Sequence, residues 1–160
     1  MIHPLKSLPE FLAHALAIEQ EATERYREFA EVYARRGEPA MAALCATLAT
    51  LEGEHLESLR TRSRGMSLPE IPPEEYRWLG GASPEAPPRT ILDAAGNRRD
   101  LLRIALRSEA ATVLFCHWVA RTSPDAQARE MAREMARDET RHVAWLERAL
   151  GYGCPSPVPA

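Results

Sequence analysis

The motif Glu-x-x-His occurs twice in the sequence, and another glutamate precedes each copy in an apolar helical setting. The six residues of this repeated pattern are Glu19, Glu52, His55, Glu109, Glu139 and His142. Side chains three residues apart on an α-helix lie one above the other, so each motif can present a carboxylate and an imidazole to one point. One copy alone is common by chance. The duplication favours a fold in which four helices bring these side chains together.

Apolar residues recur at steps of three and four along four long segments, as is typical of amphipathic helices. We predict helices over residues 8–36, 39–63, 98–122 and 124–150. Ser7, Pro9 and Glu10 form a capping box with proline in the first turn, which is a good helix start. Gly151 is a typical helix end.

Residues 64–97 are rich in proline and glycine, which excludes one long helix. A loop of this length suits a compact domain only if it travels the length of a bundle. We predict a short helical turn over Glu74 to Leu79. The side chains expected to hold the segment to the bundle are Tyr76, Trp78, Leu79, Ile91 and Leu92. The predicted fold is an all-α four-helix bundle over residues 1–151, two helical hairpins joined by a long crossover, with a loose tail over 152–160.

The four glutamates are predicted to lie at similar depths in this bundle. With a rise of about 1.5 Å per residue, Glu109 and Glu139 both lie roughly 20 Å from the turn that joins their helices. Glu19 and Glu52 lie roughly 26 and 20 Å from the turn in the other hairpin, which is close enough because helix ends are uncertain by a residue or two. All six groups can therefore converge in the middle of the bundle.

Four buried carboxylates need a counter-charge, because desolvation and mutual repulsion are both costly in a medium of low dielectric constant. Two divalent cations would balance the four negative charges while the histidines serve as neutral ligands. Mixed carboxylate and imidazole ligands suit iron or manganese better than a structural zinc. A lone glutamate on a helix is usually solvated, and Glu19 has competitors in Glu21 and Glu24. Glu109, in contrast, has apolar neighbours that indicate burial.

Composition narrows the class of protein. The chain has 160 residues, 45% of them hydrophobic and 27% charged, which fits one globular domain. A net charge of -3 gives no reason to expect nucleic acid or an anionic membrane as a partner. The three cysteines form no Cys-x-x-Cys, so neither a disulfide scaffold nor a rubredoxin-type iron site is expected. No apolar run of signal-peptide type is present, and we expect a cytoplasmic protein.

Two stretches resemble the ferritin-like superfamily, in particular the di-iron domain of rubrerythrin and bacterioferritin. Glu19 followed seven residues later by Tyr26 resembles the first-helix motif, and the run Asp138-Glu139-Thr140-Arg141-His142 resembles the Asp-Glu-x-Arg-His signature of di-iron carboxylate oxidases. The resemblance implies two iron ions, with manganese or mixed occupancy as alternatives. It implies bridging roles for Glu52 and Glu139, and terminal roles for Glu19, Glu109, His55 and His142.

The resemblance also implies roles for residues around the ligands. Asp138 is expected to accept the imidazole N–H of His55 across the bundle, with a plain surface aspartate as the alternative. Tyr26 is expected to donate a hydrogen bond to Glu109, or else to fill the core with its ring. Cys116 stands where a second tyrosine is found in the family, and is interpreted as a buried structural thiol.

Several departures from the family pattern limit the assignment. Rubrerythrins have another glutamate one turn after the third-helix ligand, where this chain has Thr112, and they usually carry a four-cysteine rubredoxin domain. Gly53 replaces the methionine that binds haem in bacterioferritin, so no haem is expected. No fifth helix is predicted after Gly151, which argues against a storage cage.

The leading functional hypothesis is a non-haem di-iron oxidoreductase that oxidises Fe(II) while reducing hydrogen peroxide or dioxygen. An external electron-donor protein would have to re-reduce the metals, and the resemblance implies a homodimer. Three alternatives stay open: an iron- or manganese-binding protein without turnover, a di-iron oxygenase acting on an organic substrate, and a metal-free structural bundle.

Overall fold

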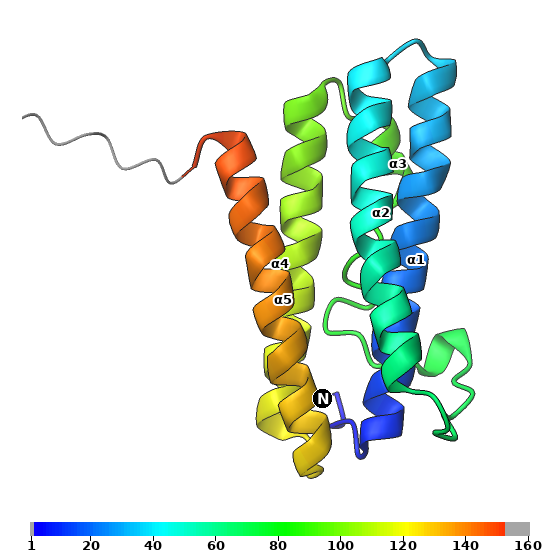
Figure 1. The fold of residues 1–160 in the computed structure, drawn as a ribbon, viewed down its shortest axis with the longest axis vertical. Coiled ribbons are helices and arrows are strands. Elements are labelled where there is room, and N and C mark those ends of the chain that lie inside the picture. Colours follow the sequence, from blue (N-terminus) through cyan, green and yellow to red (C-terminus); the bar gives the residue numbers. More distant parts are fainter. Residues whose placement is uncertain (1, 153–160) are drawn as a thin grey trace, which may run out of the picture.

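The computed structural model describes residues 2–152, and all regular structure in this range is helical. The long helices are α1 (Leu8–Arg35), α2 (Pro39–Arg62), α4 (Arg98–Thr122) and α5 (Ala126–Leu150). Helices α1 and α2 form one hairpin and α4 and α5 form the other, and the two hairpins lie side by side (Figure 1). The prediction of an all-α bundle of ferritin-like type is confirmed. Of the predicted tail, residues 153–160 lie outside the described range.

Three of the long helices have a side-chain N-cap: Ser7 caps α1, Asn97 caps α4 and Asp125 caps α5. Asp125 has a second function, because its Oδ2 accepts a hydrogen bond of 2.7 Å from the backbone N–H of Leu8. This bond joins the start of α5 to the start of α1 in the other hairpin. Because Asp125 is the cap, α5 begins at Ala126, after Pro124 rather than at it as predicted. None of the helices in residues 2–152 is long and apolar enough to cross a membrane.

The core consists of two apolar clusters, one toward each end of the bundle. On α1 the first cluster ends at Ile18 and the second begins at Ala22, and on α5 the corresponding residues are Ala136 and Leu146. The other two helices show a similar interruption. The middle of the bundle is therefore a level at which buried glutamates take the place of apolar side chains.

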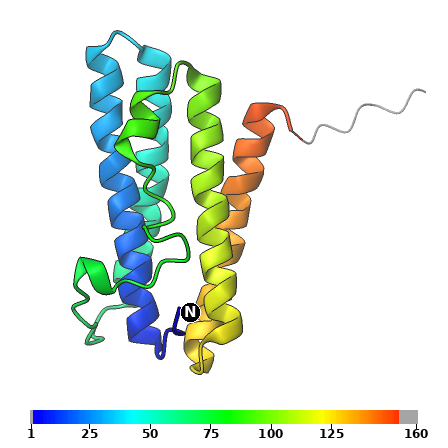
Figure 2. The ribbon, with the colours of Figure 1, turned by 180° about the vertical axis from the view of Figure 1, so that it is seen from behind.

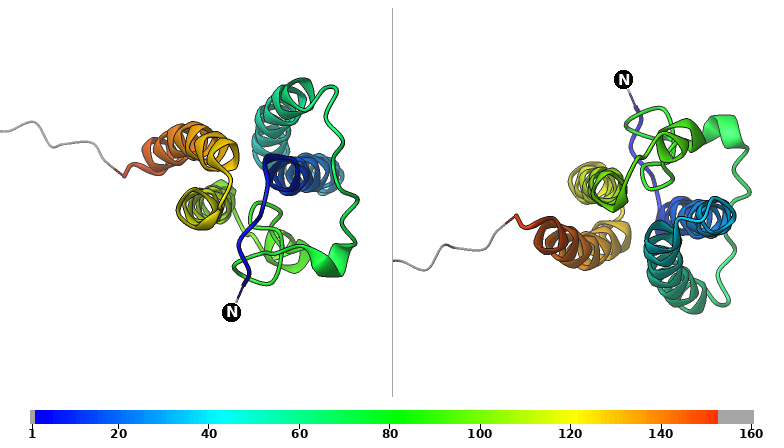
Figure 3. Two further views of the ribbon diagram at one scale, coloured as in Figure 1. Left: turned by 90° about the horizontal axis from the view of Figure 1, so that it is seen from below. Right: turned by 90° about the horizontal axis from the view of Figure 1, so that it is seen from above.

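The crossover follows the face of the bundle formed by α1 and α4 (Figures 2 and 3). It contains a 3₁₀ turn, η1 (Pro73–Glu75), and a short helix, α3 (Arg89–Asp93), that was not predicted. The predicted helical turn over residues 74–79 is wrong beyond Glu75, because Tyr76 takes an extended backbone conformation. This conformation lets the backbone N–H of Arg77 donate to Nε2 of His14 at 3.1 Å.

Aromatic packing reinforces that contact. The buried ring of His14 lies 5.0 Å from Tyr76 and 5.2 Å from Trp78, measured between ring centroids. Its Nδ1 is 2.9 Å from the backbone oxygen of Glu10. His14 is therefore a buried core histidine with a polar contact at each ring nitrogen.

Leu92 fixes the far end of the crossover. Its side chain is fully buried, and its carbonyl oxygen accepts a hydrogen bond from the hydroxyl of Tyr33. The neighbouring Ile91 is 48% exposed, and Leu79 is 43% exposed. Three of the five predicted anchors are thus buried or half-buried, and these two are exposed.

We expect Leu92→Ala to lower the free energy of unfolding by about 2–5 kcal/mol, because truncation of a buried leucine leaves a cavity. The adjacent substitution Ile91→Ala is the matched control, and should change stability by less than about 0.5 kcal/mol. Urea unfolding monitored by circular dichroism checks both. Equal effects of the two substitutions would contradict the anchoring role of Leu92.

Candidate metal centre

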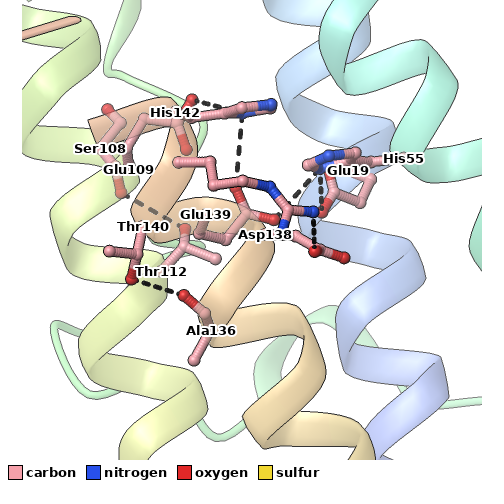
Figure 4. A network of polar contacts seen from close by, with 11 residues as sticks. Glu19, His55, Ser108, Glu109, Thr112, Ala136, Asp138, Glu139, Thr140 and His142 are labelled. Carbon is pink, nitrogen blue, oxygen red and sulfur yellow. Dashed lines mark hydrogen bonds and ion pairs between the residues drawn. The ribbon is translucent and has the colours of Figure 1, made fainter. Parts of the chain in front are cut away.

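Each long helix contributes one glutamate to the polar middle of the bundle: Glu19 from α1, Glu52 from α2, Glu109 from α4 and Glu139 from α5. All four have relative exposures of 2% or less. His55 and His142 lie beside them, with side chains 24% and 17% exposed. The structure thus brings all six predicted residues together, and Figure 4 shows five of them pointing toward one another.

Glu139 lies between the two histidines. Nδ1 of His55 is 3.1 Å from Oε1 of Glu139, and Nδ1 of His142 is 3.6 Å from its Oε2. Each histidine also faces a second carboxylate, His55 at 3.7 Å from Glu19 and His142 at 3.3 Å from Glu109. The imidazole rings stack with centroids 4.5 Å apart. A carboxylate whose two oxygens face different halves of a site has the placement that a bridging ligand requires.

Most carboxylate oxygens in this group have no hydrogen-bond donor. Among the described residues, both oxygens of Glu19, Glu52 and Glu139 are buried without a partner. Leaving such a group unsatisfied costs about 1–3 kcal/mol, and more when it is charged. A cation would take the place of the missing donors, so these residues fit a metal centre.

The spacing of the ligand atoms agrees with this interpretation. Groups of three donor atoms, one from each residue, lie within 4.8 Å of one another. Three of these groups are Glu52–His55–His142, Glu19–His55–Glu139 and Glu109–Glu139–His142. Residues His55, Glu139 and His142 each belong to two of the three groups. The donor atoms therefore form one connected centre rather than separate pockets.

Burial and the contacts among these residues shift their pKa values away from the usual ranges. Burial raises the pKa of Glu139 to about 8, and burial also raises the pKa of Glu19 and, together with the neighbouring carboxylates, that of Glu52. Burial acts to lower the pKa of His55, but its contacts with Glu139 and Glu19 outweigh this effect and raise that pKa to about 11. The raised pKa values mean that Glu139 and His55 retain protons at neutral pH. Binding of a metal ion by these ligands must release those protons.

Glu109 differs from the other three glutamates. Burial acts to raise its pKa, but the close approach of His142, whose Nδ1 lies 3.3 Å from Oε1 of Glu109, is the next largest effect, and the net result is a lowered pKa. The same contact raises the pKa of His142 against the effect of burial. Glu109 and His142 therefore behave as a carboxylate and imidazolium pair.

A further buried carboxylate was missed from the sequence. Glu85, in the crossover, is 1% exposed, and a ligand atom of Glu85 lies within 4.8 Å of atoms from Glu19 and Glu52. It comes from an irregular segment, where no helical period sets the direction of a side chain. The feature of the sequence that could have indicated its burial is a single acidic residue between Pro84 and Pro87, in a stretch of small residues.

Asp138 does not take the position expected from the resemblance. Its carboxylate forms an ion pair with Arg141, three residues later on the exposed side of α5. Nδ1 of His55 faces Glu139 and Glu19, and among the described residues no hydrogen bond joins the His55 ring to Asp138. A pair within one helix face forms readily because its partners are already neighbours. The structure therefore favours the alternative of a surface aspartate.

Tyr26 is 1% exposed, and its pKa is well above the usual range because of burial and the charges of Glu52 and Glu109. Its hydrogen bond to Glu109 stays a prediction. Cys116 is fully buried, and burial raises the pKa of its thiol well above the usual range, as expected for a structural cysteine. Thr112 is buried and its hydroxyl donates to the backbone oxygen of Ser108 at 3.3 Å (Figure 4).

A small cavity leads to the centre from the side of α2 and α5. Its volume is about 40 Å³, and its lining includes Glu19, His55 and Glu139 at the buried end. Arg62 and Glu134, whose side chains are 43% and 39% exposed, form an ion pair toward the surface. The cavity gives small molecules a route to the ligands.

Four helices that meet around buried glutamates and two histidines define a ferritin-like protein with a candidate metal site. The family model of rubrerythrin matches residues 10–90, and the chain belongs to that family. The matched residues include Glu19, Glu52, His55 and Glu85, whereas α4 and α5 lie beyond them.

A solved structure extends the similarity to almost the whole chain. It is the crystal structure of an uncharacterized conserved protein from Magnetospirillum magnetotacticum MS-1, with 28% sequence identity and a TM-score of 0.70. The match covers 94% of this chain and 99% of that one. The search of curated proteins gave no match.

Proposed function

We propose that this protein is a non-haem di-iron oxidoreductase that oxidises Fe(II) while reducing hydrogen peroxide or dioxygen. The observation that carries the proposal is the cluster of buried carboxylate oxygens without donors, centred on Glu139 between two histidines. The charge of four glutamates balances two divalent cations, and mixed oxygen and nitrogen ligands suit iron. Two iron ions held there would supply electrons in pairs to a small oxidant.

The residues around the centre have three tasks in this reaction. The four glutamates and two histidines would hold the ions, with Glu139 facing both histidines. The two apolar clusters of the core, one on each side of the site along the bundle, exclude bulk water from its two ends. His55 and Glu139 release their protons when the ions bind, so affinity for the metal should increase with pH.

The size of the cavity favours a small oxidant over an organic substrate. The cavity beside the ligands has a volume of about 40 Å³, which suits hydrogen peroxide or dioxygen. An external electron-donor protein would return the ions to the reduced state, and the family resemblance favours a homodimer.

We expect protein loaded anaerobically with Fe(II) to be oxidised faster than Fe(II) in buffer when hydrogen peroxide or dioxygen is added. Stopped-flow absorbance measures the rate, and a supply of reductant tests for repeated turnover. Oxidation that stops after one equivalent per site, even with reductant, would indicate a metal-binding protein without turnover. No acceleration over the buffer control with either oxidant would contradict the proposal.

A further inference from the structure

Glu85 has no place in the six-residue site, yet the crossover holds it firmly beside that site. The guanidinium of Arg25 on α1 donates a hydrogen bond to the backbone oxygen of Pro87, two residues after Glu85. Arg89 then pairs with Glu28 of α1, with Nε 2.8 Å from Oε1. These contacts fix the segment against α1, and the tertiary structure therefore holds Glu85 in its inward position.

The carboxylate of Glu85 has no donor of its own. The side chain is 1% exposed, and neither oxygen has a hydrogen-bond partner among the described residues. It forms a group of three with Glu19 and Glu52, whose ligand atoms lie within 4.8 Å of one another. This group contains no histidine, unlike the other three. Three buried carboxylates at this distance repel one another strongly unless a cation or protons lie between them.

We infer that Glu85 is a seventh ligand of the metal centre and binds the ion held by Glu19 and Glu52. The inference rests on the proposed function, because it assumes that the centre binds metal. A third carboxylate suits Mn(II), which favours oxygen ligands, and is also compatible with Fe(II) in a centre whose ligands are both carboxylates and imidazoles.

The competing interpretation is structural. In that case Glu85 is a neutral acid that supports Glu109 through a hydrogen bond, and it has no contact with metal. The two interpretations predict different effects of Glu85→Gln, which keeps the size of the side chain and removes its charge. As a ligand, Glu85 matters mainly when metal is bound. As a structural acid, it matters equally with and without metal.

The experiment compares wild-type protein with Glu85→Gln in the metal-free and Co(II)-loaded states. We expect the metal-free variant to melt at the same or a higher temperature, because one buried carboxylate has been removed. The increase in melting temperature on adding Co(II) should become smaller. Equilibrium dialysis should show the affinity for one of the two Co(II) ions reduced by about 10–100-fold or more. The visible absorption of bound Co(II) should also change, because it depends on the number of ligands.

Glu74→Gln is the matched control, since Glu74 is exposed in the same crossover. It should leave both affinities and the Co(II) spectrum unchanged. Glu85→Asp retains the charge and should fall between wild type and Glu85→Gln, which keeps the test usable if Glu85→Gln folds poorly.

Unchanged affinities and an unchanged spectrum in Glu85→Gln would overturn the inference. That result would leave the proposed function standing, provided that wild-type protein binds two ions. If wild-type protein bound neither Co(II) nor Fe(II), the proposed function and this inference would both be overturned. Measurements on the wild-type protein alone are enough to detect this outcome.

Discussion

We expect Glu139→Ala to lose high-affinity binding of both metal ions, because its two oxygens face the two halves of the centre. Oε1 lies 3.1 Å from His55 and Oε2 lies 3.6 Å from His142, so one substitution removes a ligand from each side. The protein would be purified without oxygen, loaded with Fe(II), desalted and analysed for metal by mass spectrometry. Its melting temperature should no longer rise on adding Fe(II), since only a ligand that binds the native state stabilises it.

Two further variants make this result specific. Glu130→Ala lies on the same helix but replaces an exposed residue paired with Arg133, and it should retain the metal content of the wild type. Glu109→Ala removes a carboxylate that faces His142 and should lower the affinity for one metal ion more than for the other. If Glu139→Ala lost no more metal than Glu109→Ala, Glu139 would not be shared between two ions.

The repeated motif predicted which side chains the fold brings together, because these residues lie on helices. A helix sets both the depth and the direction of each side chain, so counting residues from the turns placed Glu19, Glu52, Glu109 and Glu139 at one level. The same regularity made the fold class predictable. The interruption of the apolar clusters at this level then follows from the sequence itself.

Residues outside the helices could not be placed in this way. Glu85 and the contact between Arg77 and His14 depend on the path of the crossover, which is set by tertiary packing rather than by a local period. Asp138 was misplaced for a different reason. The family signature indicated a partner across the bundle, but nearby Arg141 offers a closer charge.

Placing so many carboxylates in the core makes the metal-free protein sensitive to pH. The folded state raises the pKa of Glu139 from 4.5 to about 8, and that of His55 from 6.5 to about 11. The folded protein therefore keeps protons that the unfolded chain has released. For Glu139, this stabilisation is fully present below pH 4.5 and is lost as pH rises through about 8. For His55, it is fully present below pH 6.5 and is lost as pH rises through about 11.

We therefore expect the metal-free protein to become less stable as pH rises from about 5 to about 9, by about 1.4 kcal/mol per pH unit for each retained proton. Glu109, whose pKa is lowered, acts in the opposite direction, but its effect lies in the acidic range near and below its ordinary value of 4.5. Melting temperatures measured at intervals of pH check the slope. Glu139→Gln should make it shallower, because that side chain no longer carries the retained proton.

Metal should reverse the sign of this dependence. Once cations replace the protons, stability should rise with pH from the acidic side, because protons then compete with the metal for the same ligands. The curves of metal-free and Fe(II)-loaded protein, measured anaerobically, should therefore diverge as pH increases. Parallel curves would mean that the protons of His55 and Glu139 are not exchanged for metal, and that the buried carboxylates are balanced in some other way.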